Sequence, residues 1–257
     1  MAHPIDEAVT VLGRAAQILV FTGAGISTES GIPDFRGPEG LWTMIDPDDF
    51  EIGRYLMNRE LRKRGWQMHL NGELWGARSS VKPNAAHRAI VDLWRAGRMS
   101  GCVTQNVDGL HQQAGLPDEA VAELHGNVRR THCLECGTTW PIQEVLAWVE
   151  AGNDDPHCPV CGGLIKTTTV MFGEFLPAED MRRAGRFAAK ADAVLAVGST
   201  LSVYPAAEIP LSLVRRRRPM VIVNRGQTDL DDAASVLIDG KAGEVLPPLV
   251  EGIINKR

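Results

Sequence analysis

The stretch "GAGISTESGIPDFRG", Gly23 to Gly37, directly follows a short apolar run, Gln17 to Phe21. A buried strand that ends in a glycine-rich turn is typical of nucleotide-binding α/β folds. The dinucleotide fingerprint G-x-G-x-x-G is incomplete here, because Gly23 and Gly25 fit but Thr28 occupies the third glycine position. No strand pattern precedes the acidic residues about 20 positions further on, where a ribose-binding carboxylate is expected. The turn therefore predicts a nucleotide site that differs in design from that of the dehydrogenases.

Four further apolar segments have the features of buried parallel strands, since they are short and are bounded by Gly, Pro or polar residues. Together with "ILVF" at 18–21 they are "GCVT" at 101–104, "AVLAVG" at 193–198, "MVIVN" at 220–224 and "SVLIDG" at 235–240. Helix-like stretches separate them, and this alternation predicts an α/β fold with a Rossmann-type parallel sheet and helices on both faces. Because ligands bind beyond the carboxyl ends of such strands, we expect the ends "TGAG", "TQNVD", "GSTLS" and "NRG" to meet in one crevice.

Composition limits the possible partners. The chain has 257 residues, 44% of them hydrophobic and 23% charged, which is enough for one good core and a small appended module. A net charge of −5 disfavours binding to nucleic acid or to an anionic membrane, and the basic run Arg215–Arg218 is interpreted as the end of a helix. We find no convincing export signal and no apolar run of about 18 residues, so we expect a cytoplasmic protein without a membrane partner.

Two regions interrupt the α/β alternation and predict a division of the chain. Residues 38–80 are rich in charge, Trp and Met and are expected to form a helical module. Residues 129–173 contain four of the five cysteines and are expected to form a zinc-binding module. The Rossmann-type domain would then consist of residues 1–37, 81–128 and 174–257.

The four cysteines have the spacing of a zinc ribbon. Cys133 and Cys136 form one C-x2-C pair, Cys158 and Cys161 form a second, and 21 residues separate the pairs. Each pair can direct two thiolates at one point, and two pairs complete the tetrahedron that Zn²⁺ accepts. Four thiolates leave no open position for water, so we expect a structural metal. Disulfides are disfavoured in a chain without an export signal, and the fifth cysteine, Cys102, is expected in the core.

Polar side chains are dense after the second predicted strand. The stretch "TQNVDGLH" runs from Thr104 to His111, and "ELHG" follows at Glu123–Gly126. Amide, carboxylate and imidazole groups at a strand end suit a site that orients a polar ligand and moves a proton. Taken singly, Asn106 or Asp108 is as typical of a helix cap, and His125 of a structural histidine. Their combination favours a catalytic site.

These motifs resemble those of the sirtuins, the NAD-dependent protein-lysine deacylases, in their bacterial form. The resemblance rests on several motifs that occur in family order. They are "GAGISTESGIPDFRG" at 23–37, "TQNVDGLH" at 104–111, "ELHG" at 123–126, the two cysteine pairs, "VMFGE" at 170–174, "GSTLSVYPAAE" at 198–208 and "IVNRG" at 222–226. It covers essentially the whole chain. It implies an acyl transfer from lysine to ADP-ribose with release of nicotinamide, with NAD as co-substrate, Zn²⁺ as a structural ion and acyl-lysine proteins or peptides as substrates.

The resemblance also implies roles for individual residues. His125 would be the general base, with Asn106 and Asp108 as further catalytic residues beside the nicotinamide. The tunnel for the acyl-lysine would be lined by Val170 and Phe172, with main-chain bonds to the peptide near Gly173 and Glu174. The implied NAD-binding residues are Gly23, Ala24, Gly25, Thr28, Asp34, Phe35, Arg36, Gln105, Asn106, Val107, Asp108, His125, Gly198, Ser199, Thr200, Asn224 and Lys241.

Several positions depart from the family pattern. Thr167 stands where many members have proline, and Gly226 stands where an acidic residue often follows the strand-end Asn. Members that prefer succinyl or malonyl lysine carry a Tyr and an Arg three positions apart, where this chain has Trp66 and His69. Without a guanidinium to meet an acyl carboxylate, a neutral acyl group, acetyl first, is the expected substrate. The alternatives are a mono-ADP-ribosyltransferase that uses the same NAD pocket and a non-catalytic NAD sensor.

Overall fold

A six-stranded parallel sheet forms the centre of the protein, and its strand order is β3-β2-β1-β7-β8-β9. The structure is a computed structural model that describes residues 4–35, 37, 40–43, 45–74 and 81–256. The six strands are β1 (Ile18–Thr22), β2 (Met99–Thr104), β3 (Val121–Glu123), β7 (Ala193–Val197), β8 (Met220–Asn224) and β9 (Val236–Asp239). This order is that of the dinucleotide-binding folds, with the chain reversing direction across the sheet between β1 and β7. The five predicted strands are confirmed, and β3 is an additional one.

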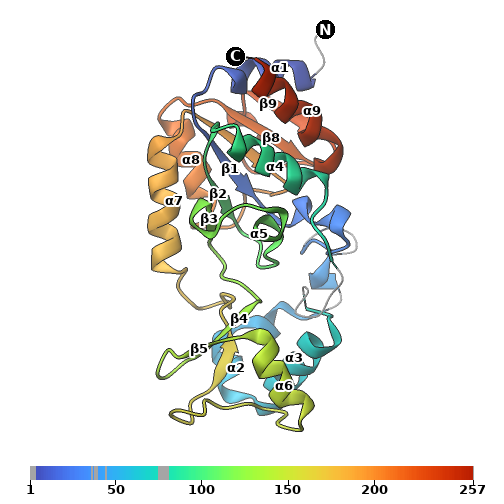
Figure 1. Cartoon of the computed structure of the whole chain (residues 1–257), viewed down its shortest axis with the longest axis vertical. Helices are drawn as coiled ribbons and strands as arrows, with labels where there is room; N and C mark the ends of the chain where they lie inside the picture. Colours follow the sequence, from blue (N-terminus) through green and yellow to red (C-terminus); the bar gives the residue numbers. More distant parts are fainter. Residues whose placement is uncertain (1–3, 36, 38–39, 44, 75–80, 257) are drawn as a thin grey trace.

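Helices cover both faces of this sheet, as predicted (Figure 1). All five residues of β1 are buried, and their side chains alternate between two cores. Ile18 and Val20 belong to the core beneath α1 (Pro4–Gly13), α4 (Ala85–Arg95) and α9 (Ala242–Asn255). Leu19 and Phe21 belong to the core beneath α7 (Ala178–Lys190) and α8 (Glu208–Arg215). A strand that is buried on both faces explains the unbroken apolar run in the sequence.

A smaller antiparallel sheet lies at the other end of the molecule (Figure 1). Its strand order is β5-β4-β6, and its elements are β4 (Arg130–Cys133), β5 (Thr139–Pro141), α6 (Ile142–Glu150) and β6 (Ile165–Thr167). Within the predicted helical insertion, the described residues form α2 (Ile52–Met57) and α3 (Arg59–Asn71).

The helical insertion and the zinc-binding module share one hydrophobic core. Trp66 of α3 is 3% exposed and belongs to the same buried cluster as Ile142, Val145 and Ile165. The Arg62 guanidinium bonds both carboxylate oxygens of Asp155, at 2.9 and 2.8 Å. We therefore treat the two modules as one unit, the small domain, and the parallel sheet with its helices as the sheet domain.

The remaining helix, α5 (Leu110–Ala114), follows β2 and packs against α4. No helix in the described part of the chain is both long and apolar enough to cross a membrane. Cys102 lies fully buried on β2, as expected, and Arg215 ends α8, with Arg216 as the cap residue.

Candidate functional site

A cavity of about 890 Å³ lies between the sheet domain and the small domain, and we call it the cleft. Its walls include the residues that directly follow β1, β2, β7 and β8, so the four predicted strand ends do converge. The small domain contributes the opposite wall, through α3 and the segment after β6. A crevice at the strand ends, beside the point where the strand order reverses, is where this fold binds nucleotides.

The ends of β1 and β7 are packed backbone against backbone. The Gly23 N–H donates to the Val197 carbonyl at 3.0 Å, and the Gly25 N–H donates to the Gly198 carbonyl at 2.9 Å. A Cβ at Gly25 would lie 2.7 Å from the Gly198 Cα, and Gly198 itself has a φ of +61°. Only glycine fits these positions without a shift, and the resulting bare backbone allows a diphosphate to approach closely. The residues present therefore fit a dinucleotide.

The β2 end places three amide or carboxylate side chains against these turns. The Asn106 Nδ2 donates to the Gly23 carbonyl at 3.1 Å and to the Ser27 Oγ at 3.2 Å. Ser27 in turn donates to Asp108 at 2.7 Å. The Gln105 Nε2 donates to the Ser199 Oγ at 2.7 Å. Side chains from three strand ends thus hold one another in fixed positions.

Asp108 lies behind the cleft wall. Burial raises the pKa of this carboxyl, while bonds from the Leu110 N–H and the Ser27 hydroxyl work against the rise. Two donors satisfy its oxygens, so it fixes the orientation of Ser27 and, through it, of Asn106. Asn106 lines the cleft and Asp108 does not.

His125 follows β3 and lines the cleft. Its Nδ1 lies 2.9 Å from the Gln105 carbonyl oxygen. Because a carbonyl can only accept, Nδ1 carries the ring proton, and Nε2 keeps a lone pair in the neutral ring. Burial lowers the pKa of His125, which favours this neutral form, and the bond to Gln105 partly opposes the shift. A neutral imidazole with an oriented lone pair can act as a general base.

The backbone of His125 is bonded to the predicted acyl-lysine segment. The Val170 N–H donates to the His125 carbonyl at 2.8 Å. The Phe172 N–H and carbonyl bond Phe50 and Ile52 of the helical insertion, at 2.8 and 3.0 Å. Its ring lies 6.1 Å from that of Trp42, centroid to centroid. Val170 and Phe172 therefore line an apolar part of the cleft that both domains build.

A buried lysine fixes the turn after Phe172. The Lys166 Nζ lies 3.0 Å from the Glu174 carboxylate and donates to the Thr169 carbonyl at 2.7 Å. The same Glu174 oxygen accepts the Met171 N–H at 2.7 Å, and the Glu174 N–H donates to the Met171 carbonyl. The polar groups of Glu174 are thus engaged within the turn, and Gly173, with a φ of +88°, closes it.

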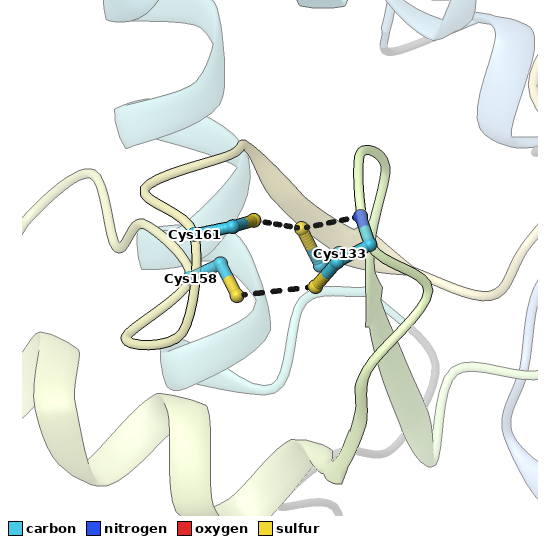
Figure 2. A group of neighbouring side chains, drawn as sticks. Cys133, Cys158 and Cys161 are labelled. Atoms are coloured by element: carbon cyan, nitrogen blue, oxygen red, sulfur yellow. Dashed lines mark hydrogen bonds between the residues drawn. The ribbon is translucent and has the colours of Figure 1, made fainter.

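The four cysteines converge on one point, as the spacing predicts. Figure 2 shows the side chains of Cys133, Cys158 and Cys161 pointing toward one another. Their sulfur atoms all lie within 4.8 Å of one another, with Cys133 and Cys161 at 3.5 Å and Cys136 and Cys158 at 3.6 Å. A tetrahedral zinc with Zn–S bonds of about 2.3 Å requires sulfur separations of roughly 3.8 Å. The donor set and spacing therefore fit a structural Zn²⁺.

Most of the predicted NAD and substrate residues line the cleft, and a few do not. The predicted residues that line it are Gly23, Ala24, Gly25, Asp34, Phe35, Gln105, Asn106, Val107, His125, Val170, Phe172, Gly173, Glu174, Gly198, Ser199, Thr200 and Asn224. Thr28 bonds the Gly25 carbonyl at 3.1 Å, and Lys241 pairs with Glu244 at 3.1 Å; neither belongs to the wall. Arg36 lies outside the described residues.

Sequence reasoning did not single out Ser27 or Lys166. Ser27 lies inside the opening stretch, but its role depends on Asp108, 81 positions further along the chain. Lys166 resembles an ordinary surface lysine in sequence, and only its 3% exposure marks it. No local pattern could have identified either residue.

The cationic groups near Trp66 and His69 are already paired. Burial lowers the pKa of His69 to about 4, so this ring is neutral. Of the arginines on this wall, Arg62 bonds Asp155 and Arg64 bonds Asp49. This part of the cleft therefore offers no unpaired guanidinium among the described residues.

Comparison with known proteins agrees with this geometry. The model of the Sir2 family matches residues 23–205. An NAD-dependent protein deacetylase of Pyrobaculum aerophilum is 41% identical over 247 residues, which are 96% of this chain and 94% of the relative. A solved structure from work on the mechanism and regulation of Sir2 enzymes has a TM-score of 0.88 at 39% identity and covers all of both chains. A structure of Sir2 with a p53 peptide and NAD+ has a TM-score of 0.84 at 35% identity, covering 96% of this chain and 97% of the other.

The match spans the glycine turn, the histidine, the cysteine cluster and the β7 end, which are the features that build the cleft. This chain belongs to the Sir2 family, the sirtuins.

Proposed function

We infer that this chain is an NAD-dependent protein-lysine deacetylase in which His125 is the general base. The observation that carries this inference is the position of His125 at the junction of two surfaces. Its side chain is held by Gln105 at the nucleotide end of the cleft, and its backbone holds Val170 at the apolar end. A base that serves both an NAD ribose and an acyl-lysine has to lie between their sites.

Bound NAD supplies the electrophilic ribose carbon, the leaving nicotinamide and the ADP-ribose that accepts the acyl group. The glycine turns at the β1 and β7 ends hold the diphosphate, and Gln105 orients the neighbouring ribose. Asn106, fixed by Gly23 and Ser27, faces the carboxamide together with Val107. His125 accepts a proton from a ribose hydroxyl at Nε2, because its Nδ1 proton is committed to Gln105.

The acyl-lysine enters between Val170 and Phe172. Apolar walls and the pairing of Arg62 and Arg64 make this part of the cleft suited to a neutral acyl group, because neither of these two guanidinium groups is free to bind an acyl carboxylate. We expect an acetylated peptide to be turned over faster than its succinylated twin. Faster turnover of the succinylated peptide would contradict the assignment of this wall.

The net charge and the cysteines of the chain support proposals about its partners and its location in the cell. A net charge of −5 does not favour nucleic acid or anionic membranes as partners, and it favours basic substrate peptides. A four-thiolate site requires reduced cysteines, which supports a cytoplasmic location. We also propose the boundaries 38–80 and 129–173 for the two parts of the small domain.

Nicotinamide release distinguishes this function from its rivals. We would measure it with an acetyl-lysine peptide and with the unacetylated twin, for the wild type and for His125→Ala. Deacetylation predicts release that requires the acetyl group, lysine freed in equal amount, and a loss of about 10²–10⁴-fold in the variant. ADP-ribose on protein would indicate a transferase, and NAD binding without turnover would indicate a sensor.

A further inference from the structure

Two buried histidines lie behind the cleft, and the proposed reaction does not use them. His87 on α4 is 0% exposed and His111 on α5 is 1% exposed. Their ring centroids are 5.1 Å apart. Burial lowers the pKa of His87 to about 2 and that of His111 to about 4, so both rings are neutral around pH 7. Neither residue belongs to the cleft wall.

The hydrogen bonds of His111 identify its tautomer. Its Nε2 lies 2.9 Å from the Thr22 Oγ1. Thr22 donates its single hydroxyl proton to the Thr104 Oγ1, at 2.8 Å. Thr22 must therefore accept from His111, which places the ring proton of His111 on Nε2 and leaves a lone pair on Nδ1.

The same reasoning applies to His87. The Asn84 N–H can only donate, and it reaches the His87 Nδ1 at 3.3 Å. The Asn84 Oδ1 lies 3.1 Å from the same nitrogen, but its two lone pairs already accept the N–H groups of Ala86 and His87. The ring proton of His87 consequently lies on Nε2.

Two complementary atoms are left over. The His87 Nε2 and the His111 Nδ1 are buried and have no hydrogen-bond partner among the described residues. One is a donor and the other an acceptor, and each would be costly to leave unsatisfied. A single water shared by the two rings would satisfy both atoms, since it would accept from His87 and donate to His111. With that water, every donor in the series from His87 through His111 and Thr22 would point toward Thr104, and the bonds would reinforce one another.

This series ends directly beneath the proposed carboxamide site. The Thr104 Oγ1 accepts the Asn106 N–H at 3.0 Å, and Asn106 lines the cleft. We propose that His87 and His111, with one shared water, are positioning residues that hold the Thr22 and Thr104 hydroxyls so that Asn106 is fixed for NAD. The role of Asn106 toward NAD rests on the proposed function, whereas the hydrogen-bonded series does not.

Two substitutions of His111 separate positioning from simple filling of the core. The amide of His111→Gln reaches the position of Nε2 and can still donate to Thr22. The amide of His111→Asn reaches only the position of Nδ1. We expect the Gln variant to stay close to the wild type, and the Asn variant to raise the KM for NAD by about 3- to 10-fold with a smaller change in kcat, as for one lost hydrogen bond.

Thr22→Val provides a second test of the same connection, because valine keeps the shape of the threonine side chain and removes its hydroxyl. It should raise the KM for NAD as His111→Asn does, and the double variant should lose little more than either single one, since both break the same connection. Equal KM values for the Gln and Asn variants, or additive losses in the double variant, would overturn the proposal. Thermal unfolding of each variant shows whether an effect on KM exceeds a general loss of folded protein.

A measurement on the wild type is independent of turnover. Nitrogen-15 NMR of the histidine side chains should show His87 and His111 as neutral Nε2–H tautomers, and a high-resolution crystal structure should show a water bonded to both rings. An Nδ1–H tautomer at His111, or rings without a shared water, would refute the series even in an active enzyme. An inactive wild type with the expected tautomers would instead refute the proposed function.

Discussion

At the scale of single residues, the imidazole of His125 sets the pH range of the reaction. Burial lowers the pKa of His125 from its ordinary value near 6.5. A general base works only when unprotonated, so activity should be lost as the pH falls through this lowered pKa. We expect kcat/KM for the acetylated peptide to have an acid limb with its midpoint below pH 6.5 and to stay level above it.

This pH profile needs a control for unfolding at low pH. Circular dichroism over the same pH range shows whether the protein remains intact where the acid limb falls. A midpoint at or above pH 6.5 in an intact protein would mean that a group other than His125 limits the rate, or that substrate binding reverses the effect of burial.

The sequence predicts a site well where a local motif defines it. It predicts a site poorly where the contacts depend on the order of strands in the sheet. The cysteine cluster follows from spacing alone, because each pair is local and the metal geometry joins the pairs. The bonds from Asn106 to Gly23 and from Ser27 to Asp108 join the ends of β1 and β2, and they depend on which strands are neighbours. Their residue types could be named from the sequence, but their pairing could not.

At the scale of elements, the contact between the β1 and β7 ends governs NAD binding. A Cβ on Gly198 would lie 2.3 Å from the Ile26 N, and its φ of +61° is strained for any side chain. Gly198→Ala should separate the two turns and raise the KM for NAD by at least about tenfold. Gly185→Ala is the control, since Gly185 lies within α7 with nothing within 4 Å of its Cβ position.

The two glycine variants should also differ in their effect on stability. Alanine within an exposed helix stabilises by about 0.5–1 kcal/mol, so Gly185→Ala should unfold at a higher temperature with an unchanged KM for NAD. Kinetics and thermal unfolding measure both effects. An unchanged KM in Gly198→Ala would show that the turns tolerate separation.

The ion pair between α3 and the zinc-binding module is the second contact between elements that can be tested. Arg62 and Asp155 are buried, and Arg62 also donates to the Tyr55 carbonyl at 2.9 Å. Arg62→Met removes both short bonds to the buried Asp155 carboxylate, which keeps only a longer contact to Arg59 at 3.7 Å, and should destabilise the small domain by about 3–5 kcal/mol. Urea unfolding followed by the fluorescence of Trp66, Trp140 and Trp148 measures this loss.

Arg54→Met tests whether burial is responsible. Arg54 is exposed and pairs with Asp48 and Asp49 at 3.8 and 3.5 Å, and removal of such a surface residue should cost less than about 1 kcal/mol. Similar losses in the two variants would indicate that the Arg62 pair contributes no more than a surface pair.

Within the parallel sheet, strand prediction missed β3 for a physical reason. The three residues of β3, Val121–Glu123, are too few for an apolar run, and β3 pairs only with β2 at the sheet edge. The position of His125 nevertheless depends on this strand, because the chain reaches the cleft directly from it. A short edge strand leaves little periodic signal in a sequence.

At the scale of the whole molecule, the cleft exists because two domains that do not share a hydrophobic core face each other. The sheet domain has its own clusters on both faces of the sheet, and the small domain has a third built around Trp66, Ile142 and Ile165. The sequence predicts the two insertions but not their common core, since Trp66 and Ile142 are far apart in the chain. That packing follows from contacts between α3 and α6.

Separate cores imply that loss of zinc unfolds one part of the molecule. Four thiolates left without a metal would repel one another when ionised. The core beside Cys133 and Cys158 would also lose the cross-link that the metal provides between the two cysteine pairs. We expect one zinc per chain, and chelation should abolish deacetylation and expose the small domain to hydrogen exchange while the parallel sheet stays protected. Cys136→Ser should behave like the chelated protein. Cys102→Ala, which removes a buried thiol of the sheet domain, should keep its zinc. Exchange that rises equally in both domains would show that they unfold as one cooperative unit.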